Sequence, residues 1–195
     1  MMILFKRFKI KRLLKKIKAL QHTRLHNPAK PEDIKSELGY YNELIVIYRS
    51  LIGHKKYPHA LFSMLECLRQ ASQLEDAMSS YELGQYLLNE AIFRKRLQGE
   101  GIFASNSNEK RAIELFDEAH AYLSLAEKLS SVKAKRLRGL CYINGWGVDP
   151  DKGKGFELIV ASINDENSWE KVPEIFKELG LNKPEFFQAL NQHRR

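Results

Sequence analysis

The sequence predicts an all-α fold: a short α/α solenoid of antiparallel helix pairs with a basic amphipathic helix at its N-terminus. Three observations predict it. Apolar residues recur at steps of three and four through nearly the whole chain, which is the period of a helix. Almost no stretch alternates polar and apolar residues as a half-buried strand does. Two segments also align with each other at the spacing of a helical hairpin repeat.

The composition is that of an ordinary globular chain. Of 195 residues, 44% are apolar and 29% are charged, which excludes collagen-like, mucin-like and wholly disordered chains and fits one domain, or two at most. No apolar run reaches the length of a membrane span, and the run 1–5 is too short for a signal peptide. A mitochondrial presequence is disfavoured because the basic N-terminus is mostly Lys and has no Ser before residue 30.

Positive charge is concentrated at the N-terminus. Residues 1–30 hold ten Lys and Arg and no acidic residue, whereas residues 31–195 hold 22 basic and 24 acidic residues. We therefore divide the chain into a basic arm with a hinge, residues 1–30, and a helical-repeat domain, residues 31–195. The break is expected at 27–31, which contains two prolines. The candidate residues for contact with an anionic surface are Lys6, Arg7, Lys9, Lys11, Arg12, Lys15, Lys16 and Lys18.

The arm forms an amphipathic helix from residue 10 onward, while Phe5 and Phe8 fall on its charged side. Its apolar face consists of Ile10, Leu13, Leu14, Ile17 and Leu20. Three uses of this face remain open: packing on the body as the first helix of the solenoid, insertion into an anionic membrane surface, or docking in a groove of a partner protein. Nucleic-acid binding through the lysines is a weaker alternative, because the net charge of the body is near zero and the body has no recognised nucleic-acid-binding motif.

The rest of the chain contains a series of segments whose apolar residues recur at the helical period. These segments are 34–51, 61–71, 77–92, 112–129, 134–142, 156–163 and 169–179. Gly53 ends the first stripe, and Pro58 suits the first turn of the second. A last short helix begins near Asn182, a suitable N-cap, with Pro184 in its first turn.

Two segments of the body repeat each other. Residues 99–102 align with 145–148 at a shift of 46, and residues 112–119 align with 155–162 at a shift of 43. A period of this length, built from two helices and a turn that contains Gly, is typical of an α-solenoid. The glycines suit a turn with positive φ, and small helical residues allow two backbones to approach closely.

The second of these segments resembles the Sel-one-like repeat, a relative of the tetratricopeptide repeat. The residues that carry the resemblance are Ala134, Gly139, Tyr142, Gly145, Gly147, Val148 and Asp151, followed by Gly155 where the family has Ala. Arg138 stands where Leu is usual, Leu158 replaces an aromatic residue and Ser162 replaces Ala. The earlier copy lacks the Tyr and has Asn108 for Asp, so the resemblance covers about 84–164. It implies a platform for protein–protein contacts of the kind found in bacterial secretion, envelope or host-interaction systems.

Motifs for catalysis and metal binding are missing from the sequence. The loop 145–155 has the wrong spacing for a phosphate-binding loop and lacks a preceding strand, and a calcium loop from Asp149 would end on Val160. The cluster Glu114, Asp117, Glu118 and His120 has no second copy to complete a di-iron site. Cys67 and Cys141 belong to no metal motif, so we expect buried thiols in a reducing compartment.

These observations lead to one expected function. We expect no enzyme, no catalytic or metal-binding residue, no cofactor and no small-molecule substrate. The expected function is that of a non-catalytic adaptor whose helical-repeat surface binds a peptide or helix of another protein, such as a subunit of a bacterial secretion complex, while the arm tethers it to a membrane or partner. The expected location is the cytoplasm, at the inner face of the membrane if the arm binds lipid. The alternatives are a peripheral membrane protein that acts mainly through its arm, and a weak nucleic-acid binder.

Overall fold

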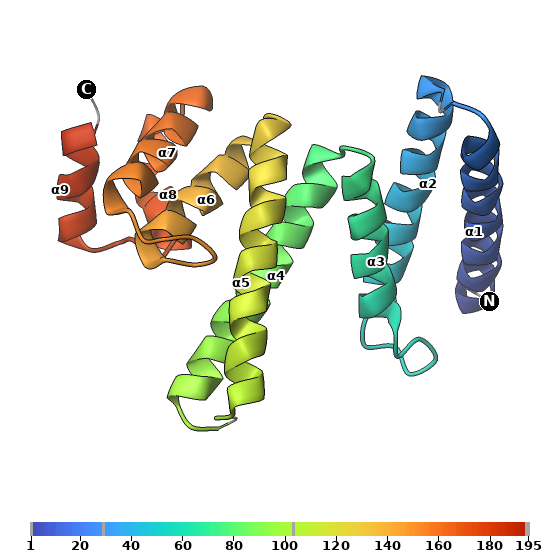
Figure 1. The fold of residues 1–195 in the computed structure, drawn as a ribbon, viewed down its shortest axis with the longest axis horizontal. Coiled ribbons are helices and arrows are strands. Elements are labelled where there is room, and N and C mark those ends of the chain that lie inside the picture. The colour runs from blue at the N-terminus through green and yellow to red at the C-terminus, as the bar shows by residue number, and fades with distance from the viewer. Residues whose placement is uncertain (1, 29, 103, 194–195) are drawn as a thin grey trace. The chain divides into compact units, whose positions relative to one another are not determined.

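The computed structural model describes residues 2–28, 30–102 and 104–193, and their regular structure is entirely helical (Figure 1). The predicted all-α class is therefore confirmed. The chain forms two compact units, Met1–Ser79 and Ser80–Arg195, which we call unit 1 and unit 2. Within each unit, consecutive helices pack against their neighbours in the chain, as in an α/α solenoid.

The helices that lie wholly in unit 1 are α1 (Met2–His26), α2 (Pro31–Arg49) and α3 (Ala60–Gln73). The predicted break at 27–31 separates α1 from α2, and Pro31 occupies the first turn of α2, where its missing N–H costs nothing. Both α1 and α3 pack on α2, and each runs antiparallel to it (Figure 1).

Helix α1 belongs to the core of unit 1. Ile10, Leu13 and Ile17 are all at most 7% exposed, Leu20 is half-buried, and Leu14, expected on the same face, is 41% exposed. The compact units divide after Ser79, whereas the sequence analysis divided the chain at residue 30. The apolar face of α1 is covered by its own unit, which is the first of the three uses considered above. Helix α1 packs along α2 and is not a separate arm.

A partly buried ion pair joins the end of α1 to α2. The carboxylate of Glu37, whose side chain is only 3% exposed, lies 2.9 Å from Nη1 of Arg24. Gln21 donates from Nε2 to Glu37 Oε1 at 3.2 Å and to the Tyr41 hydroxyl at 3.0 Å. Burial, together with the charge of Glu37, raises the pKa of Tyr41 to about 12. This polar network is satisfied from both helices, so it fixes the register of α1 on α2.

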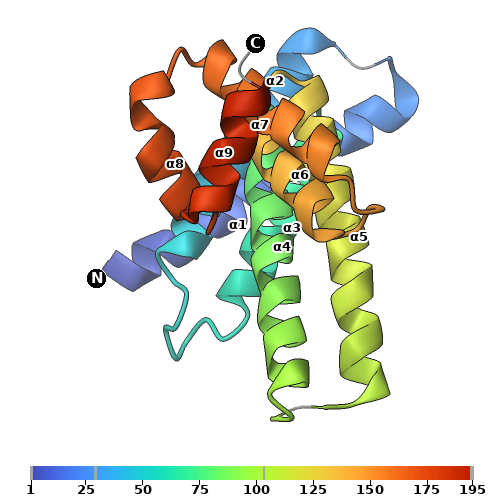
Figure 2. The same cartoon turned by 90° about the vertical axis from the view of Figure 1, so that its left-hand side faces the viewer.

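Unit 2 is built from helix pairs in chain order. Its elements are α4 (Ala77–Gly99), α5 (Asn106–Lys128), α6 (Val132–Asn144), α7 (Lys152–Asp165), the 3₁₀ turn η1 (Trp169–Lys171), α8 (Val172–Glu178) and α9 (Pro184–His193). Helices α4 and α5 lie side by side as a long hairpin (Figure 2). Helix α6 packs on both α5 and α7, and α9 packs on α7.

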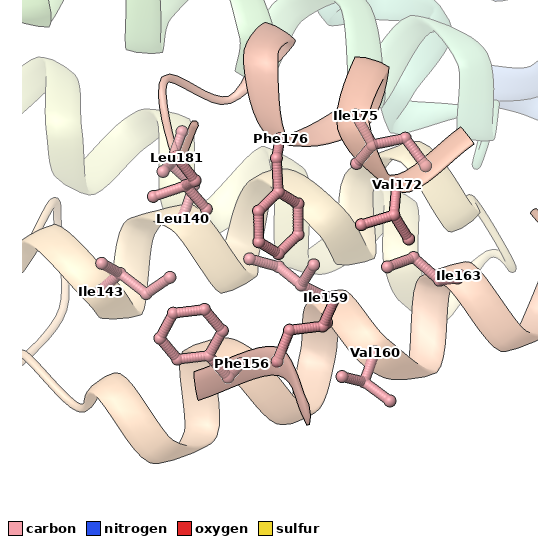
Figure 3. Close-up of a cluster of buried hydrophobic side chains, with 11 residues drawn as sticks. Leu140, Ile143, Phe156, Ile159, Val160, Ile163, Val172, Ile175, Phe176 and Leu181 are labelled. Carbon is pink, nitrogen blue, oxygen red and sulfur yellow. The ribbon is translucent and has the colours of Figure 1, made fainter. Parts of the chain in front are cut away.

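The core of unit 2 lies between α6, α7 and the C-terminal elements. Ile159, Ile163 and Phe176 are fully buried, and their side chains point toward one another (Figure 3). The remaining buried members of this cluster are Leu140, Ile143, Phe156, Val160, Val172, Ile175, Leu181 and Leu190. A buried side chain of this kind contributes roughly 1.5–3 kcal/mol, so this cluster stabilises the crossing of α6 and α7 that carries the repeat turn.

Three helix starts differ from the sequence prediction. Helix α3 begins at Ala60, so Pro58 lies in the preceding turn. The stripe 169–179 is divided into η1 and α8, because Pro173 cannot continue a helix from the turn before it and instead occupies the first turn of α8. Helix α9 begins at Pro184, two residues after the predicted N-cap Asn182. Each difference amounts to one or two residues at a helix end, except the division at Pro173.

Candidate protein-binding site

The Gly-containing turn after α6 is built from the residues that the sequence analysis singled out. Gly145 caps α6 in the left-handed conformation at φ 66°, and the Trp146 N–H donates to the Cys141 carbonyl at 3.0 Å. Gly147 has the same positive φ of 66°. The side chain of Asp151 then accepts from the Lys154 N–H at 3.0 Å and so caps the start of α7. The turn is therefore held at both ends by helix caps.

Gly147 also allows the turn to pack closely against the backbone of α5. A Cβ atom at this position would lie 2.2 Å from the carbonyl oxygen of Phe116, so any side chain would clash with the backbone of α5. Beside it, the Trp146 ring stacks on the Phe116 ring with centroids 5.6 Å apart and planes 11° apart. The sequence accounts for this glycine by its φ, but the approach to α5 is visible only in the structure.

Helices α6 and α7 cross at two glycines, Gly139 and Gly155. A Cβ atom at Gly139 would lie 2.6 Å from the Gly155 carbonyl oxygen, and one at Gly155 would lie 2.7 Å from that of Gly139. Ala134, which lies on α6 with Gly139, is fully buried. The prediction that small residues let α6 and α7 approach closely is therefore confirmed.

In the earlier, degenerate copy the helix cap is Ser105. Its hydroxyl accepts from the Asn108 N–H at 3.1 Å, as Asp151 does for α7, and the shift between Ser105 and Asp151 is 46. Our alignment of Asn108 with Asp151 is therefore wrong in structural terms. The Asn108 amide instead joins the two helices of the hairpin, because it donates to the Arg94 carbonyl and accepts from the Arg94 guanidinium, both at 3.2 Å.

Where the repeat turn meets the α4–α5 hairpin, the surface of unit 2 forms a notch of about 850 Å³. We call it the repeat notch. Phe116 lines it and is itself buried, Val148 comes from the repeat turn, and Ile113 of α5 is 56% exposed to solvent. Lys95 of α4 places its ammonium 5.9 Å from the Phe116 ring, and Asp149 lies on the turn side. The notch thus offers apolar contact area between charges of both signs.

The ring of Tyr142, on α6, lies close to two cations, Lys154 and Arg138. The Lys154 ammonium lies 4.2 Å from its ring centroid, and the His120 ring meets it edge-on at 5.6 Å. Arg138, the departure from the family's Leu, forms an ion pair with Glu127 beside this ring. Burial, and then the charges of Arg138 and Lys154, lower the pKa of His120 below its usual value of 6.5, so the uncharged imidazole is favoured at neutral pH.

The acidic cluster of α5 is a solvated face. Arg111 pairs with Glu114 at 3.0 Å and lies 3.7 Å from Glu118. Over the described residues, no group of three or more His, Cys, Asp or Glu side chains is arranged to hold a metal ion. Cys67 and Cys141 are free and buried, as expected, and burial raises the pKa of both thiols to about 12.

The eight candidate basic residues between Lys6 and Lys18 of α1 fall into two sets. Three of them contact α2, since Lys9 pairs with Glu43 at 3.0 Å, Lys6 donates to the Ser50 hydroxyl at 2.9 Å, and Lys16 lies 4.8 Å from the Tyr40 ring centroid. The others have exposed side chains: Arg7, Lys11, Arg12, Lys15 and Lys18. Near the start of the helix, Leu4, Phe5 and Phe8 are also exposed, by 74%, 67% and 68%. Within the described residues, no helix is both long and apolar enough to span a membrane.

The geometry thus defines helix pairs joined by a capped, glycine-containing turn, with a notch beside that turn. Comparisons of the chain with protein families, with curated proteins and with solved structures find no match in any of the three.

Proposed function

We propose that this protein is a non-catalytic adaptor that binds a segment of a partner protein in the repeat notch of unit 2. The observation that carries the proposal is the notch itself, a hollow of about 850 Å³ at the turn that joins the repeat helices. Its volume is that of a site for a short peptide segment or a few side chains. More than half of the surface of Ile113 is exposed to solvent, and a bound partner would bury it.

The resemblance to Sel-one-like repeats supports the same function. In that family, helix pairs serve as platforms for other proteins, and an adaptor of this kind would operate in a bacterial secretion or envelope-associated complex. The charges on both sides of the notch, Lys95 and Asp149, would orient a polar segment whose apolar side chains contact Ile113 and Phe116.

Two variants with matched exposure test the proposal in a quantitative pull-down from the native host with the full chain. Ile113→Asp places a charge in the notch, whereas Ile102→Asp places the same charge at a residue that is 58% exposed and outside the notch lining. We expect one partner to co-purify with the wild type and with Ile102→Asp, and to fall at least about tenfold with Ile113→Asp. Equal recovery with both variants, or no enriched protein at all, would contradict the proposal.

The exposed start of α1 favours a second candidate function, contact with an anionic membrane surface. Leu4, Phe5 and Phe8 expose their apolar side chains, and Arg7 and Arg12 are exposed on the same helix. Apolar insertion combined with cationic attraction is the mode of interfacial helices, and each basic residue near such a surface contributes about 1 kcal/mol. In this function, α1 keeps its packing on α2 and binds lipid through its outer side.

Vesicle co-sedimentation of the full chain tests this second function. With phosphatidylserine-containing vesicles, we expect the double variant Phe5→Ser/Phe8→Ser to bind at least about tenfold more weakly than the wild type. The control is Phe62→Ser on α3, because Phe62 is 70% exposed and so matches Phe8. If vesicle binding is the same for all three proteins, or if neutral phosphatidylcholine vesicles bind equally well, the membrane function fails.

A further inference from the structure

A second hollow lies in unit 1, between α1 and α3. It measures about 590 Å³ and is lined almost entirely by apolar surface. Tyr41 and Tyr48 of α2 line it between α1 and α3, Leu14 stands on the α1 side, and Phe62 stands on the α3 side. We call it the α1–α3 groove. It is formed by different residues from those of the repeat notch and of the exposed start of α1.

Two large apolar side chains on the walls of this groove are unusually exposed. Leu14 is 41% and Phe62 is 70% accessible to solvent, although the residues between them, Ile17 and Cys67, are buried. Helices α1 and α3 each pack on α2, and the groove lies between them, over Tyr41 and Tyr48 of α2. Helices pack at distances of about 8–10 Å, and a fourth helix in this position would cover both exposed side chains.

The α1 wall of the groove is positively charged. Lys11, Lys15 and Lys18 line it at steps of four and three, so they form one row along the helix. All three are exposed, and none has an ion-pair partner among the residues that the structure describes, in contrast to Lys9. On the opposite wall, the charge of Glu66 is compensated by Arg69 at 3.2 Å. The groove therefore presents an apolar floor with a cationic edge.

We propose that the α1–α3 groove binds an amphipathic helix of a partner protein, with its apolar face on Leu14 and Phe62 and with acidic residues along the edge that faces the lysines. A helix is the occupant that matches this geometry, because acidic residues at steps of four and three would form a row parallel to that of Lys11, Lys15 and Lys18. The inference goes beyond the proposed adaptor function, since it concerns another unit and another surface.

The test is a selection from a displayed library of amphipathic helical peptides in which the charged positions vary freely between Glu and Lys. The immobilised target is the full chain, and a parallel selection uses the double variant Leu14→Ser/Phe62→Ser. We expect the wild type to enrich peptides with Glu along one edge, and we expect the best of these to bind the double variant at least about tenfold more weakly in a titration. Because both replaced side chains are exposed, the thermal unfolding of the variant should match that of the wild type.

Charge reversal provides the second readout. The triple variant Lys11→Glu/Lys15→Glu/Lys18→Glu should bind the Glu-edged peptides about tenfold or more weakly at low salt, and should prefer the matching Lys-edged peptides. Leu25→Ser, at an 81% exposed residue of the same helix that lies outside the groove lining, should bind like the wild type. The proposal is overturned if the selection enriches Lys-edged peptides or none, or if binding survives in Leu14→Ser/Phe62→Ser. It is also overturned if these residues mediate self-association in sedimentation, or vesicle binding, in place of peptide binding.

Discussion

Replacing Gly147 by alanine is expected to lower the free energy of unfolding by about 3 kcal/mol or more. Two costs add at this position. The backbone is in the left-handed region at φ 66°, where a side chain costs roughly 1–2 kcal/mol. The new Cβ would also lie 2.2 Å from the Phe116 carbonyl oxygen, and this backbone atom of α5 cannot rotate away as a side chain would. The turn must therefore move off α5, which also disrupts the stacking of Trp146 on Phe116.

Gly101→Ala is the matched control for this substitution. Gly101 has φ 72°, but a Cβ atom there would meet no other atom within 4 Å. Its replacement should cost only the conformational part, about 1–2 kcal/mol. Chemical denaturation of both variants measures the difference, which isolates the contact with α5. If the two variants lose the same stability, the turn does not rest on Phe116, and the repeat notch does not have the shape described here.

Helical periodicity predicts most of the buried face of α1, but not what covers it. Ile10, Leu13 and Ile17 share one face of α1 in the sequence and are buried together in the structure. Leu14 was assigned to the same face and lies at its edge, because neighbouring residues point about 100° apart around a helix. Whether that face is covered by the body, by lipid or by a partner depends on α2, so no pattern within residues 1–30 could decide it.

The change in charge near residue 30 and the division into compact units fall at different places in the chain. The change from all-basic to mixed charge near residue 30 reflects the exposed side of α1, while the buried side of the same helix continues the core of unit 1. The actual division, after Ser79, falls inside α4, where neither composition nor helical period changes. Boundaries between packed units depend on long-range contacts, and these are not encoded in local composition.

The candidate sites were predicted only in part. The glycines and Asp151 could be identified because a left-handed turn and a helix cap each have a strong local residue preference. The notch beside the turn could not, since Ile113 and Val148 are brought together by the packing of α6 on α5. Phe62 was not singled out at all. Its one sequence signal is that it lies outside the stripe that begins at Leu61 and Met64, which predicts exposure but no partner.

The second large effect is expected when Arg24 is replaced by alanine. This change leaves the Glu37 carboxylate, which is only 3% exposed, without the cation that lies 2.9 Å away. Removing one partner of a buried pair costs about 3–5 kcal/mol, and we expect about 2–4 kcal/mol here because the Arg24 side chain is 37% exposed and water can partly replace it. The hydrogen bond from Gln21 is retained, but it does not neutralise the charge. Thermal unfolding of the full chain measures the loss.

The double variant Arg24→Ala/Glu37→Gln separates the cost of leaving the Glu37 charge unpaired from the cost of losing the Arg24 side chain. Gln keeps the shape of Glu37 and removes its charge, so the double variant should recover more than half of the stability that Arg24→Ala loses. Lys9→Ala is the control for an exposed pair, because Lys9 and Glu43 are 43% and 49% exposed, and it should cost at most about 1 kcal/mol. If Arg24→Ala costs no more than Lys9→Ala, Glu37 is hydrated in solution and α1 is not fixed on α2 by this pair. The α1–α3 groove would then lose one of the contacts that hold its cationic wall in place.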